Sequence, residues 1–388
     1  IEPDDFGFYE KIKVPPPTFC PECRLQRRMA FRNLFQLFRR KCDLCGEEKI
    51  SVYSPDAPYR IYCPQCWWSD KWDFRDYGRE YDFSKPFFKQ FNALLHDAPL
   101  LGLSINAKTA EIAPFNSGVG DAKNCYLLFH ASLVEDSAYG YMVVSNKSVF
   151  DSSLIMESEL CYDAFHAFQD NRCIGVEHTN QSIQCAFLKN CINCQNCFAS
   201  ANLRNKRYYI FNKPHTKEEY FEEMKKWDLG SYAIYQKAKA LAKEHWGKYP
   251  PKPLWDDFSK DCTGNFVFQS KNCKECYELT GAQDSKYLML MSIAPTKDSY
   301  DIFSWGENLS LSYESEDVGA NATGVKFCSE SGLTIEDVEY SKLTTGGSHH
   351  FGCVSARKGE YFILNKQYSK EEYVKFREKI VAHMNEMP

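Results

Sequence analysis

The sequence contains no apolar run close to the ~18 consecutive residues that a membrane-spanning helix requires. It contains no nucleophile elbow, no glycine-rich phosphate-binding loop, no HExxH metal motif and no convincing pair of catalytic carboxylates, so its motifs point to no common class of enzyme. An excess of basic residues is also missing: the formal net charge is −5, and any nucleic-acid binding would depend on a local patch. With 388 residues, 44% of them hydrophobic, the chain can bury a large core in two or three globular units.

Cysteine, in contrast, is abundant. The chain has 18 cysteines and no visible signal peptide, which favours a reducing, cytoplasmic location over a disulfide scaffold. Two CxxC pairs are separated by 17 residues, and these are Cys42/Cys45 and Cys63/Cys66. Because Gly46 follows the first pair and strand-like runs occupy 49–53 and 59–62, this spacing predicts a zinc ribbon that holds one Zn²⁺ through four thiolates. A redox pair or buried thiols would be the alternative for a single CxxC, but two pairs at this spacing favour metal.

A third CxxC pair, Cys20/Cys23, has no partner pair left in the chain. It is preceded by Phe8-Tyr9 and a proline run at 15–17, and it is followed by Arg24, Arg27 and Arg28. In these features the N-terminal segment resembles the second half of the probable zinc-ribbon domain family, and the whole chain resembles uncharacterised zinc-ribbon proteins of uncultured bacteria. The resemblance implies that Cys20 and Cys23 are two ligands of a second zinc site whose other CxxC pair lies ahead of Ile1. We therefore expect this chain to be a trimmed form of a longer one.

The segment 24–41 is the one strongly basic patch. It has seven basic residues, no acidic residue, no glycine and no proline, which predicts a helix. On one arc of that helix lie Arg24, Arg28, Arg32 and Arg39, with Phe31 and Phe35 beside them. Such a face suits phosphate contact and base stacking, so it predicts binding of RNA or DNA. The alternative is an amphipathic linker whose arginines pair with acidic residues of the same chain, such as those in 70–80.

Three of the seven tryptophans, Trp67, Trp68 and Trp72, directly follow the ribbon. Exposed, such a cluster would bind a protein partner. Buried, it would pack the ribbon against the helix that follows.

Residues 124–207 repeat every twelve positions. One column of the repeat contains Cys125, Ser137, Val149, Cys161, Cys173, Cys185 and Cys197, and a second column, six residues later, contains Ala131, Val143, Ile155, Ala167, Thr179, Cys191 and Leu203. Small residues at a short fixed period, without a helical pattern, predict a parallel β-solenoid whose columns stack inward. Cys191, Cys194 and Cys197 could form a metal cluster, but as members of such columns we interpret them as small core residues.

A second copy of this pattern follows. Asn124-Cys125 recurs as Asn272-Cys273, 148 residues later, and both copies end in a strand-like run followed by a capping box, at Thr216 and at Ser369. We interpret this as an internal duplication. One solenoid coil could contain twelve or about 24 residues. The many aromatic residues favour the wider coil, because a narrow coil could not bury them.

The predicted fold is mainly β with flanking helices, in which one or more zinc ribbons precede a duplicated, β-helix-like parallel β-solenoid. The expected units are 1–80 with the ribbon and a basic helix at 24–41, a connector at 81–123, a first solenoid at 124–215, a helical connector at 216–260, and a second solenoid with a C-terminal helix at 261–388. The function that we expect is a non-enzymatic zinc-binding platform that contacts nucleic acid or a nucleoprotein. The alternatives are a protein-interaction scaffold and an enzyme that acts on a polysaccharide in a solenoid groove.

Overall fold

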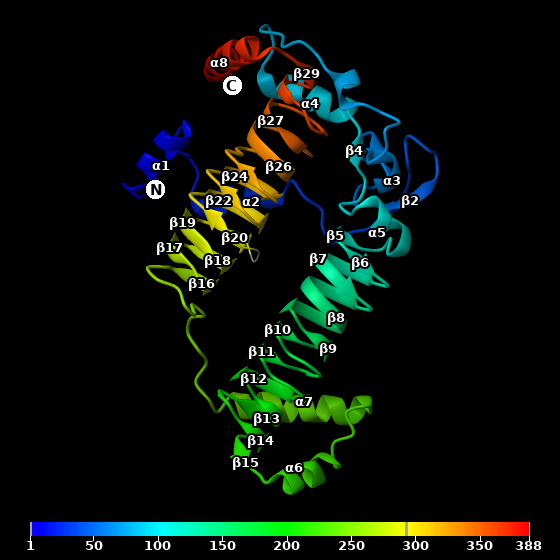
Figure 1. Ribbon diagram of the computed structural model, residues 1–388, viewed down its shortest axis with the longest axis vertical. Coiled ribbons are helices and arrows are strands. Elements are labelled where there is room, and N and C mark those ends of the chain that lie inside the picture. Colours follow the sequence, from blue (N-terminus) through cyan, green and yellow to red (C-terminus); the bar gives the residue numbers. More distant parts are fainter. Residues whose placement is uncertain (1, 292–293, 388) are drawn as a thin grey trace.

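The structure is a computed structural model that describes residues 2–291 and 294–387. Two parallel β-solenoid units lie side by side as two rods, with the ribbon region and α4 (Phe87–Asp97) at one end of the pair (Figure 1). The helices α6 (Lys217–Met224) and α7 (Tyr232–Trp246) close the far end of the first unit. The predicted class, mainly β with flanking helices and a β-solenoid, is confirmed. None of the helices in the described part of the chain is long and apolar enough to cross a membrane.

The first unit is built from narrow coils. Its strands are β5 (Ser117–Val119), β6 (Ala122–Lys123), β7 (Tyr126–Glu135), β8 (Ala138–Met156), β9 (Glu159–Tyr162), β10 (Phe165–Phe168), β11 (Glu177–Asn180), β12 (Ala186–Ile192), β13 (Gln195–Ala201), β14 (Arg207–Ile210) and β15 (Lys213–Pro214). Phe165 pairs in parallel with Glu177, and Glu177 pairs with Lys189, so each coil contains twelve residues. The wider coil of about 24 residues that the aromatic content favoured is wrong.

Each coil is four-sided. From Asn124 to Asn202 every third residue has a positive φ, which turns the chain at a corner, and the next residue points inward. A left-handed conformation costs roughly 1–2 kcal/mol for a residue other than glycine, and pairing with the coils above and below offsets this cost. Three residues per side therefore give twelve per coil.

Four inward columns form the core of the first unit, and the sequence analysis identified two of them. The predicted burial of Cys125, Cys161, Cys173, Cys185 and Cys197 is confirmed. The two further columns contain Leu128, Gly140, Ser152, Ala164, Val176, Leu188 and Ser200, and Val134, Asn146, Ser158, Asp170, Ser182 and Cys194. Their inward polar groups are paired: Ser137 Oγ donates to the Glu135 carbonyl at 2.8 Å and accepts from Val149 N at 3.0 Å, one coil later. A polar core of this kind avoids the cost of unpaired buried groups.

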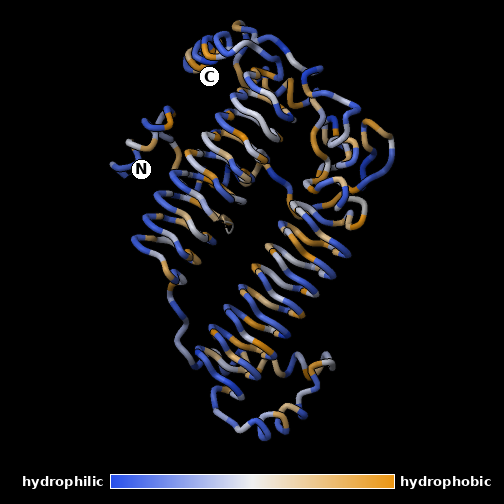
Figure 2. Tube along the Cα trace, viewed as in Figure 1, coloured by the Kyte–Doolittle hydropathy of each residue, from blue (hydrophilic) through white to orange (hydrophobic). Residues whose placement is uncertain are grey.

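The aromatic residues that favoured a wide coil lie on the outside. Tyr126, Tyr139, Phe150 and Tyr162 are 41–54% exposed on the first unit, so a narrow coil does not need to enclose them. Hydrophobic segments recur regularly along both rods, as expected when one residue in three points inward (Figure 2).

The second unit follows the same plan, with twelve-residue coils at both ends and longer coils in its middle. Its strands are β16 (Gly264–Phe268), β17 (Lys271–Lys274), β18 (Cys276–Thr280), β19 (Ala282–Lys286), β20 (Met289–Met291), β21 (Thr296–Lys297), β22 (Tyr300–Gly306), β23 (Leu309–Ser310), β24 (Tyr313–Gly319), β25 (Ala322–Thr323), β26 (Ser329–Glu339), β27 (Thr345–Phe351), β28 (Glu360–Ile363) and β29 (Lys366–Gln367). Hydrogen bonds between stacked coils span 14 residues from Ser285 to Ser299, and 13 from Ser299 to Ser312 and from Ser312 to Val325.

Both units end in the same way. An antiparallel hairpin closes each rod, β14 with β15 and β28 with β29. In each hairpin turn one asparagine bonds both backbone groups of a residue in the coil below: Asn212 bonds Ala201, and Asn365 bonds Val354. A helix with a capping box follows, α6 after Thr216 and α8 (Lys370–Glu386) after Ser369, and each packs on its own hairpin. The predicted helix starts near Lys217 and Lys370 are therefore confirmed.

The N-terminal region contacts both solenoid units. Its elements are α1 (Asp5–Ile12), α2 (Pro21–Met29), β1 (Phe38–Lys41), β2 (Glu48–Ser51), β3 (Ile61–Tyr62), α3 (Pro64–Trp67), the 3-10 helix η1 (Phe74–Tyr77), α4, β4 (Leu100–Leu101) and α5 (Ala107–Ile112). Helix α2 packs on β22 and β24 of the second unit. The predicted continuous helix at 24–41 is wrong, because α2 ends at Met29 and residues 38–41 form a strand instead.

Candidate metal centre

The first CxxC pair lies in a tight turn after β1. Strands β1 and β2 pair in antiparallel register, with Lys41 opposite Glu48. The turn is closed by bonds from Cys42 N to the Glu47 carbonyl and from Gly46 N to the Cys42 carbonyl, both 2.9 Å. Gly46 has a φ of 75°, a conformation that glycine adopts at little cost and that lets the chain turn back directly after Cys45.

The second CxxC pair begins a short helix. Cys63 is the N-cap of α3, Pro64 is its first residue, and Cys66 lies one turn on, so both sulfurs lie at the same end of the helix. The strand before it, β3, pairs in parallel with β4 and not with β2. The two predicted ribbon strands therefore form close to their predicted places, but they do not pair with each other. Strand β2 pairs with β1 around the first CxxC turn, and β3 pairs with β4, which precedes the first solenoid.

The four sulfur atoms converge. The Sγ atoms of Cys42, Cys45, Cys63 and Cys66 all lie within 4.8 Å of one another. A tetrahedral site with metal–sulfur bonds of ~2.3 Å would place its sulfurs roughly 3.8 Å apart, so this arrangement fits four ligands of one ion. Three of the side chains are buried, and Cys45 is exposed. This group can hold a metal ion.

The protein surroundings shift the pKa values of the three buried ligands in different directions. Burial raises the pKa of Cys63 to about 11, and burial also raises the pKa of Cys66. Burial acts in the same direction on Cys42, but backbone N–H groups of Cys45, Cys63 and Leu44 outweigh it and lower the pKa of that thiol. One of these donors, Cys63 N, lies 3.3 Å from Cys42 Sγ. When a metal ion binds to buried thiols of this kind, the thiols release their protons and bind the metal as thiolates.

The centre touches both solenoid units. Cys42, Cys63 and Cys66 belong to one hydrophobic cluster with Phe351 and Cys353 from the last coils of the second unit. On the other side, Ile50 and Val52 pack against the core of the first unit, and Ser51 Oγ donates to the Gly102 carbonyl at 2.8 Å. The ribbon is therefore a junction between the two rods.

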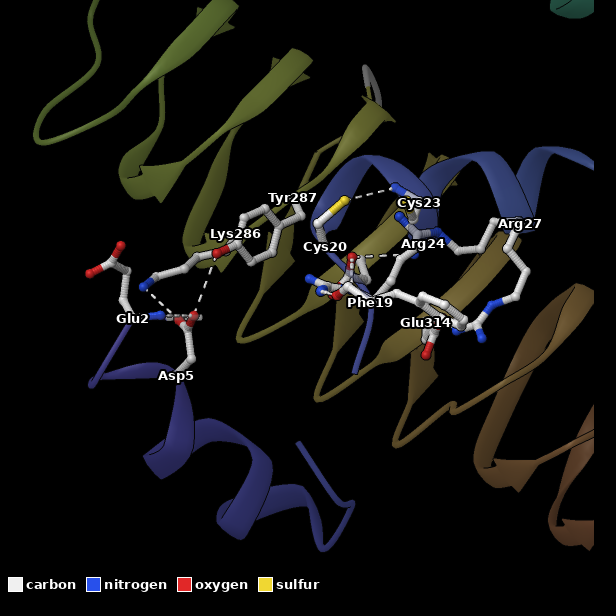
Figure 3. A network of polar contacts seen from close by, with 12 residues as sticks. Glu2, Asp5, Phe19, Cys20, Cys23, Arg24, Arg27, Lys286, Tyr287 and Glu314 are labelled. Carbon is white, nitrogen blue, oxygen red and sulfur yellow. Dashed lines mark hydrogen bonds and ion pairs between the residues drawn. The ribbon is translucent and has the colours of Figure 1, made fainter. Parts of the chain in front are cut away.

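The pair Cys20/Cys23 lies elsewhere, at the start of α2. Both side chains are exposed, and Cys20 is the N-cap whose sulfur accepts from Cys23 N at 3.5 Å (Figure 3). Among the described residues no third ligand joins them within metal-binding distance. Their role in a second zinc site stays a prediction.

The arginine arc predicted for nucleic acid is not on the surface. Arg24 and Arg28 are 1% and 3% exposed, and both pair with the buried carboxylate of Asp301, Arg24 at 2.9 Å and Arg28 at 3.2 Å. Burial raises the pKa of Asp301, and the two guanidinium groups oppose that rise. On the same helix Arg27 pairs with Glu314 (Figure 3). The expectation of a solvent-facing arc is therefore wrong. The alternative of arginines that pair within the chain describes the structure, but the acidic partners belong to the second unit and not to residues 70–80.

The rest of the basic segment is divided between the two rods. Arg32 is buried and pairs with Asp317 of the second unit at 2.9 Å. Phe35 packs on Phe129 and Tyr141 of the first unit, with ring centroids 5.2 and 5.3 Å away. Arg39 alone of the predicted arc remains exposed, with 69% of its side chain accessible beside Glu48. We call residues 19–36 the strap, because they connect the two units.

The tryptophan cluster packs the junction. Trp67 and Trp72 are 0% and 8% exposed, and Trp68 is 37% exposed. The guanidinium of Arg357, from the last coils of the second unit, lies 4.5 Å from the Trp72 ring centroid and donates to the Trp67 carbonyl at 2.8 Å. A partner site built on Trp67 and Trp72 therefore does not fit this structure, whereas the packing role does.

Sequence reasoning missed the partners of these groups. Asp301, Asp317 and Arg357 decide where the strap and the junction lie, yet none stands in a motif. A weak signal existed: the repeat leaves Asp301, Glu314 and Asp317 outside the inward columns, so these carboxylates lie on the outer surface of the second unit, where basic residues of another segment can pair with them.

One cleft of about 960 Å³ lies between α5 and the first unit. Along its floor Lys123, Glu135, Lys147 and Glu159 follow one another at one-coil spacing, and Lys147 lies 3.6 Å from Glu135. Because acids alternate with lysines, the charges within this ladder compensate one another.

No model of a known protein family matches this chain, and no curated protein matches it, so its function has to be inferred from the geometry of the ribbon, the strap and the two rods.

Proposed function

We propose that this protein is a non-enzymatic scaffold in which a zinc-loaded ribbon locks two β-solenoid rods together. Four thiolates are a donor set typical of structural Zn²⁺, and a closed site of four cysteines leaves no open position for catalysis. The observation that carries the proposal is the shared packing of Cys42, Cys63 and Cys66 with Phe351 and Cys353, while Ile50 and Val52 of the same ribbon pack on the other rod.

Zinc would stabilise the junction more than the rods. The ribbon strands are two to four residues long and pair with one strand each, so their own backbone pairing is weak and a bound metal would be the main cross-link between the two CxxC turns. The rods are stabilised by stacking of coils, which does not involve the four ligands. Loss of metal should therefore loosen the link between two units that stay folded.

RNA or DNA contact is not part of this proposal. The positive charges of Arg24, Arg28 and Arg32 are matched by Asp301 and Asp317, so they are not free to displace counterions from a phosphate backbone.

We also infer that the two units arose by duplication of one solenoid. Asn212 and Asn365 close the two rods with the same pair of bonds, 153 residues apart. The offset at the first coils is 148. The offset therefore grows by five residues between the first coils and the closing hairpins. Relative to coils of twelve residues, the second unit has two extra residues in one coil of 14 and one extra residue in each of three successive coils of 13, which accounts for this difference.

The test combines metal analysis with Cys45→Ser. Cys45 is the exposed ligand, so this change removes a thiolate with little effect on packing. We expect about one zinc per chain in the unmodified protein and its loss in the variant. Limited trypsin digestion of the zinc-free protein should cut within residues 38–66, while the β-structure signal in circular dichroism stays nearly unchanged.

Cys262→Ser is the matched control, because Cys262 lies outside the ribbon and is only partly exposed. It should keep both the zinc and the resistance to trypsin. Purified protein without zinc, or a ribbon that resists trypsin equally well after chelation, would contradict the proposal.

A further inference from the structure

A second cavity lies at the opposite end of the first rod, between its flank and the chain that leaves α7. Its volume is about 550 Å³. The floor consists of outward side chains from three successive coils, among them His178, Asn190 and Asn202, each twelve residues from the next. The roof is formed by the end of α7 and the segment 247–255. A cavity of this size is in the range that small ligands occupy.

The roof is tied to the floor, so the cavity has a defined shape. Asn202 Nδ2 donates to the Pro250 carbonyl at 3.2 Å, and Asn190 Nδ2 donates to Asn202 Oδ1 at 2.6 Å. Arg204 in turn donates to Asn190 Oδ1 at 2.8 Å. These amides are occupied by the protein itself, which leaves the charged and aromatic groups to face a ligand.

Positive charge predominates around the cavity. Lys189, Lys243 and Lys252 line it, against the single carboxylate of Glu177. Lys189 lies 3.1 Å from Glu177, and Lys252 lies 2.8 Å from Asp257 outside the lining. Within the described part of the chain Lys243 forms no ion pair, so its ammonium group is available to an anion.

The walls are aromatic. The ring of Trp255 packs at a tilt against His178, with centroids 4.6 Å apart, and Trp246 and Tyr249 also line the cavity. Trp246 is 6% exposed, and its indole N–H has no acceptor among the described residues. Lys189 and Lys252 lie over the rings of Trp246 and Trp255, at 5.7 and 4.7 Å, so ammonium groups and ring faces occur together. Burial lowers the pKa of His178 to about 4, so this ring is neutral at neutral pH and can stack without adding charge.

We propose that this cavity binds a small organic anion that carries a planar ring, of the size of a mononucleotide. The ammonium group of Lys243, which forms no ion pair among the described residues, holds the anionic group, and the aromatic walls hold the ring. The site is far from the ribbon and does not depend on the proposed role of zinc.

The test is calorimetric titration of the full zinc-loaded chain with three probes: AMP, adenosine and inorganic phosphate. We expect saturable binding of AMP and at least about tenfold weaker binding of the other two, because each lacks one of the two recognised features. Binding of phosphate as tightly as AMP would overturn the role of the ring. Binding of adenosine as tightly as AMP would overturn the role of the anion, and no binding of AMP at millimolar concentration would overturn the proposal.

Variants locate the site. Lys243→Gln should weaken AMP binding by about tenfold or more, because a charge-assisted hydrogen bond is lost. Lys237→Gln is the control, since Lys237 is an exposed lysine on the same helix that does not line the cavity. Equal losses in the two variants would show non-specific attraction and contradict the proposal. Trp255→Leu should weaken AMP binding and leave phosphate binding unchanged, which an effect on folding alone would not do.

Discussion

The two solenoid units share one plan but differ in coil length and in what covers them. The first keeps twelve residues per coil from Cys125 to Cys197, and its far end is covered by α7. The second has coils of 13 or 14 residues between Ser285 and Val338, and those coils face the strap. Their outward carboxylates, such as Asp301 and Asp317, receive the arginines of the strap.

The difference shows where a coil of this kind tolerates insertion. The extra residue enters on one side only, where inward residues are four positions apart instead of three, as from Val318 to Ala322 and from Ser331 to Ile335. At this side Gly306, Gly319 and Gly332 stack at 13-residue spacing. Inward spacing on the other sides is unchanged, so an added residue alters the outer surface and leaves most of the core as it was.

The largest expected effect concerns the charges between the strap and the second unit. Asp301→Ala leaves two buried guanidinium groups without a partner and should lower the free energy of unfolding by about 3–5 kcal/mol. Asp298→Ala removes the pairing with Lys11, whose side chain is 52% exposed, and should cost less than about 1 kcal/mol. Urea unfolding followed by tryptophan fluorescence measures both, and equal losses would mean that the strap does not depend on Asp301.

The second prediction concerns a buried acid inside the first unit. Burial raises the pKa of Asp170 to about 7, although Ser182 N donates to its Oδ1 at 2.8 Å. Because this folded-state pKa lies above the ordinary value, the folded state binds more protons between about pH 4 and pH 7, and stability should fall as pH rises through this window. The total loss should be of the order of 4 kcal/mol at about pH 8.

Asp170→Asn should remove that pH dependence and make the first unit more stable at about pH 8. Asn146 occupies the same inward column two coils earlier, donates to the carbonyls of Val144 and Ile155, and accepts from Ser158 N, so the core already holds an amide in this place. Unfolding curves at about pH 5 and pH 8 test this. If the stability of the variant depended on pH as strongly as that of the unmodified protein, the pH dependence would have to come from groups other than Asp170.

The third prediction concerns the side of the second unit that received the extra residues. A Cβ on Gly319 would lie 2.1 Å from the Gly306 carbonyl oxygen and 2.7 Å from the Trp305 ring, so Gly319→Ala should cost about 1–3 kcal/mol. Gly7→Ala in α1 has nothing within 4 Å and should instead stabilise by about 0.5–1 kcal/mol. Thermal unfolding of both variants measures the contrast, and a neutral Gly319→Ala would show that the coils of the second unit can separate.

The smallest expected effect concerns Arg39. Its 3.4 Å pair with Glu48 is exposed on both sides, so Arg39→Gln should change the free energy of unfolding by less than about 0.5 kcal/mol. Arg32→Gln, which leaves Asp317 without its guanidinium, should cost several times more. Similar effects of the two changes would contradict the division of the basic segment into strap arginines that pair with the second unit and an exposed ribbon edge.

The sequence by itself determined what depends on local spacing. Two CxxC pairs with a glycine after the first predict a four-sulfur cluster, the twelve-residue period predicts stacked inward cysteines, and the boxes at Thr216 and Ser369 predict two helix starts. Each of these follows from geometry within one turn or between adjacent coils. The coil size could have been read from the same pattern. The coil size was missed because two of the four inward columns contain residues such as Gly140, Ser152 and Asn146. Their side chains are small or polar, so the sequence does not show a hydrophobic residue at every third position.

Only the tertiary structure decided which surfaces stay free. Arg24 and Arg28 were correctly placed on one face of a helix, but their partner Asp301 lies more than 270 residues away, and no local pattern shows that a buried carboxylate will meet that face. Trp67 and Trp72 likewise became core residues because Arg357 and the last coils of the second unit cover them. Burial and charge compensation are properties of the packed chain, since they depend on segments that come together only when both rods and the ribbon have formed.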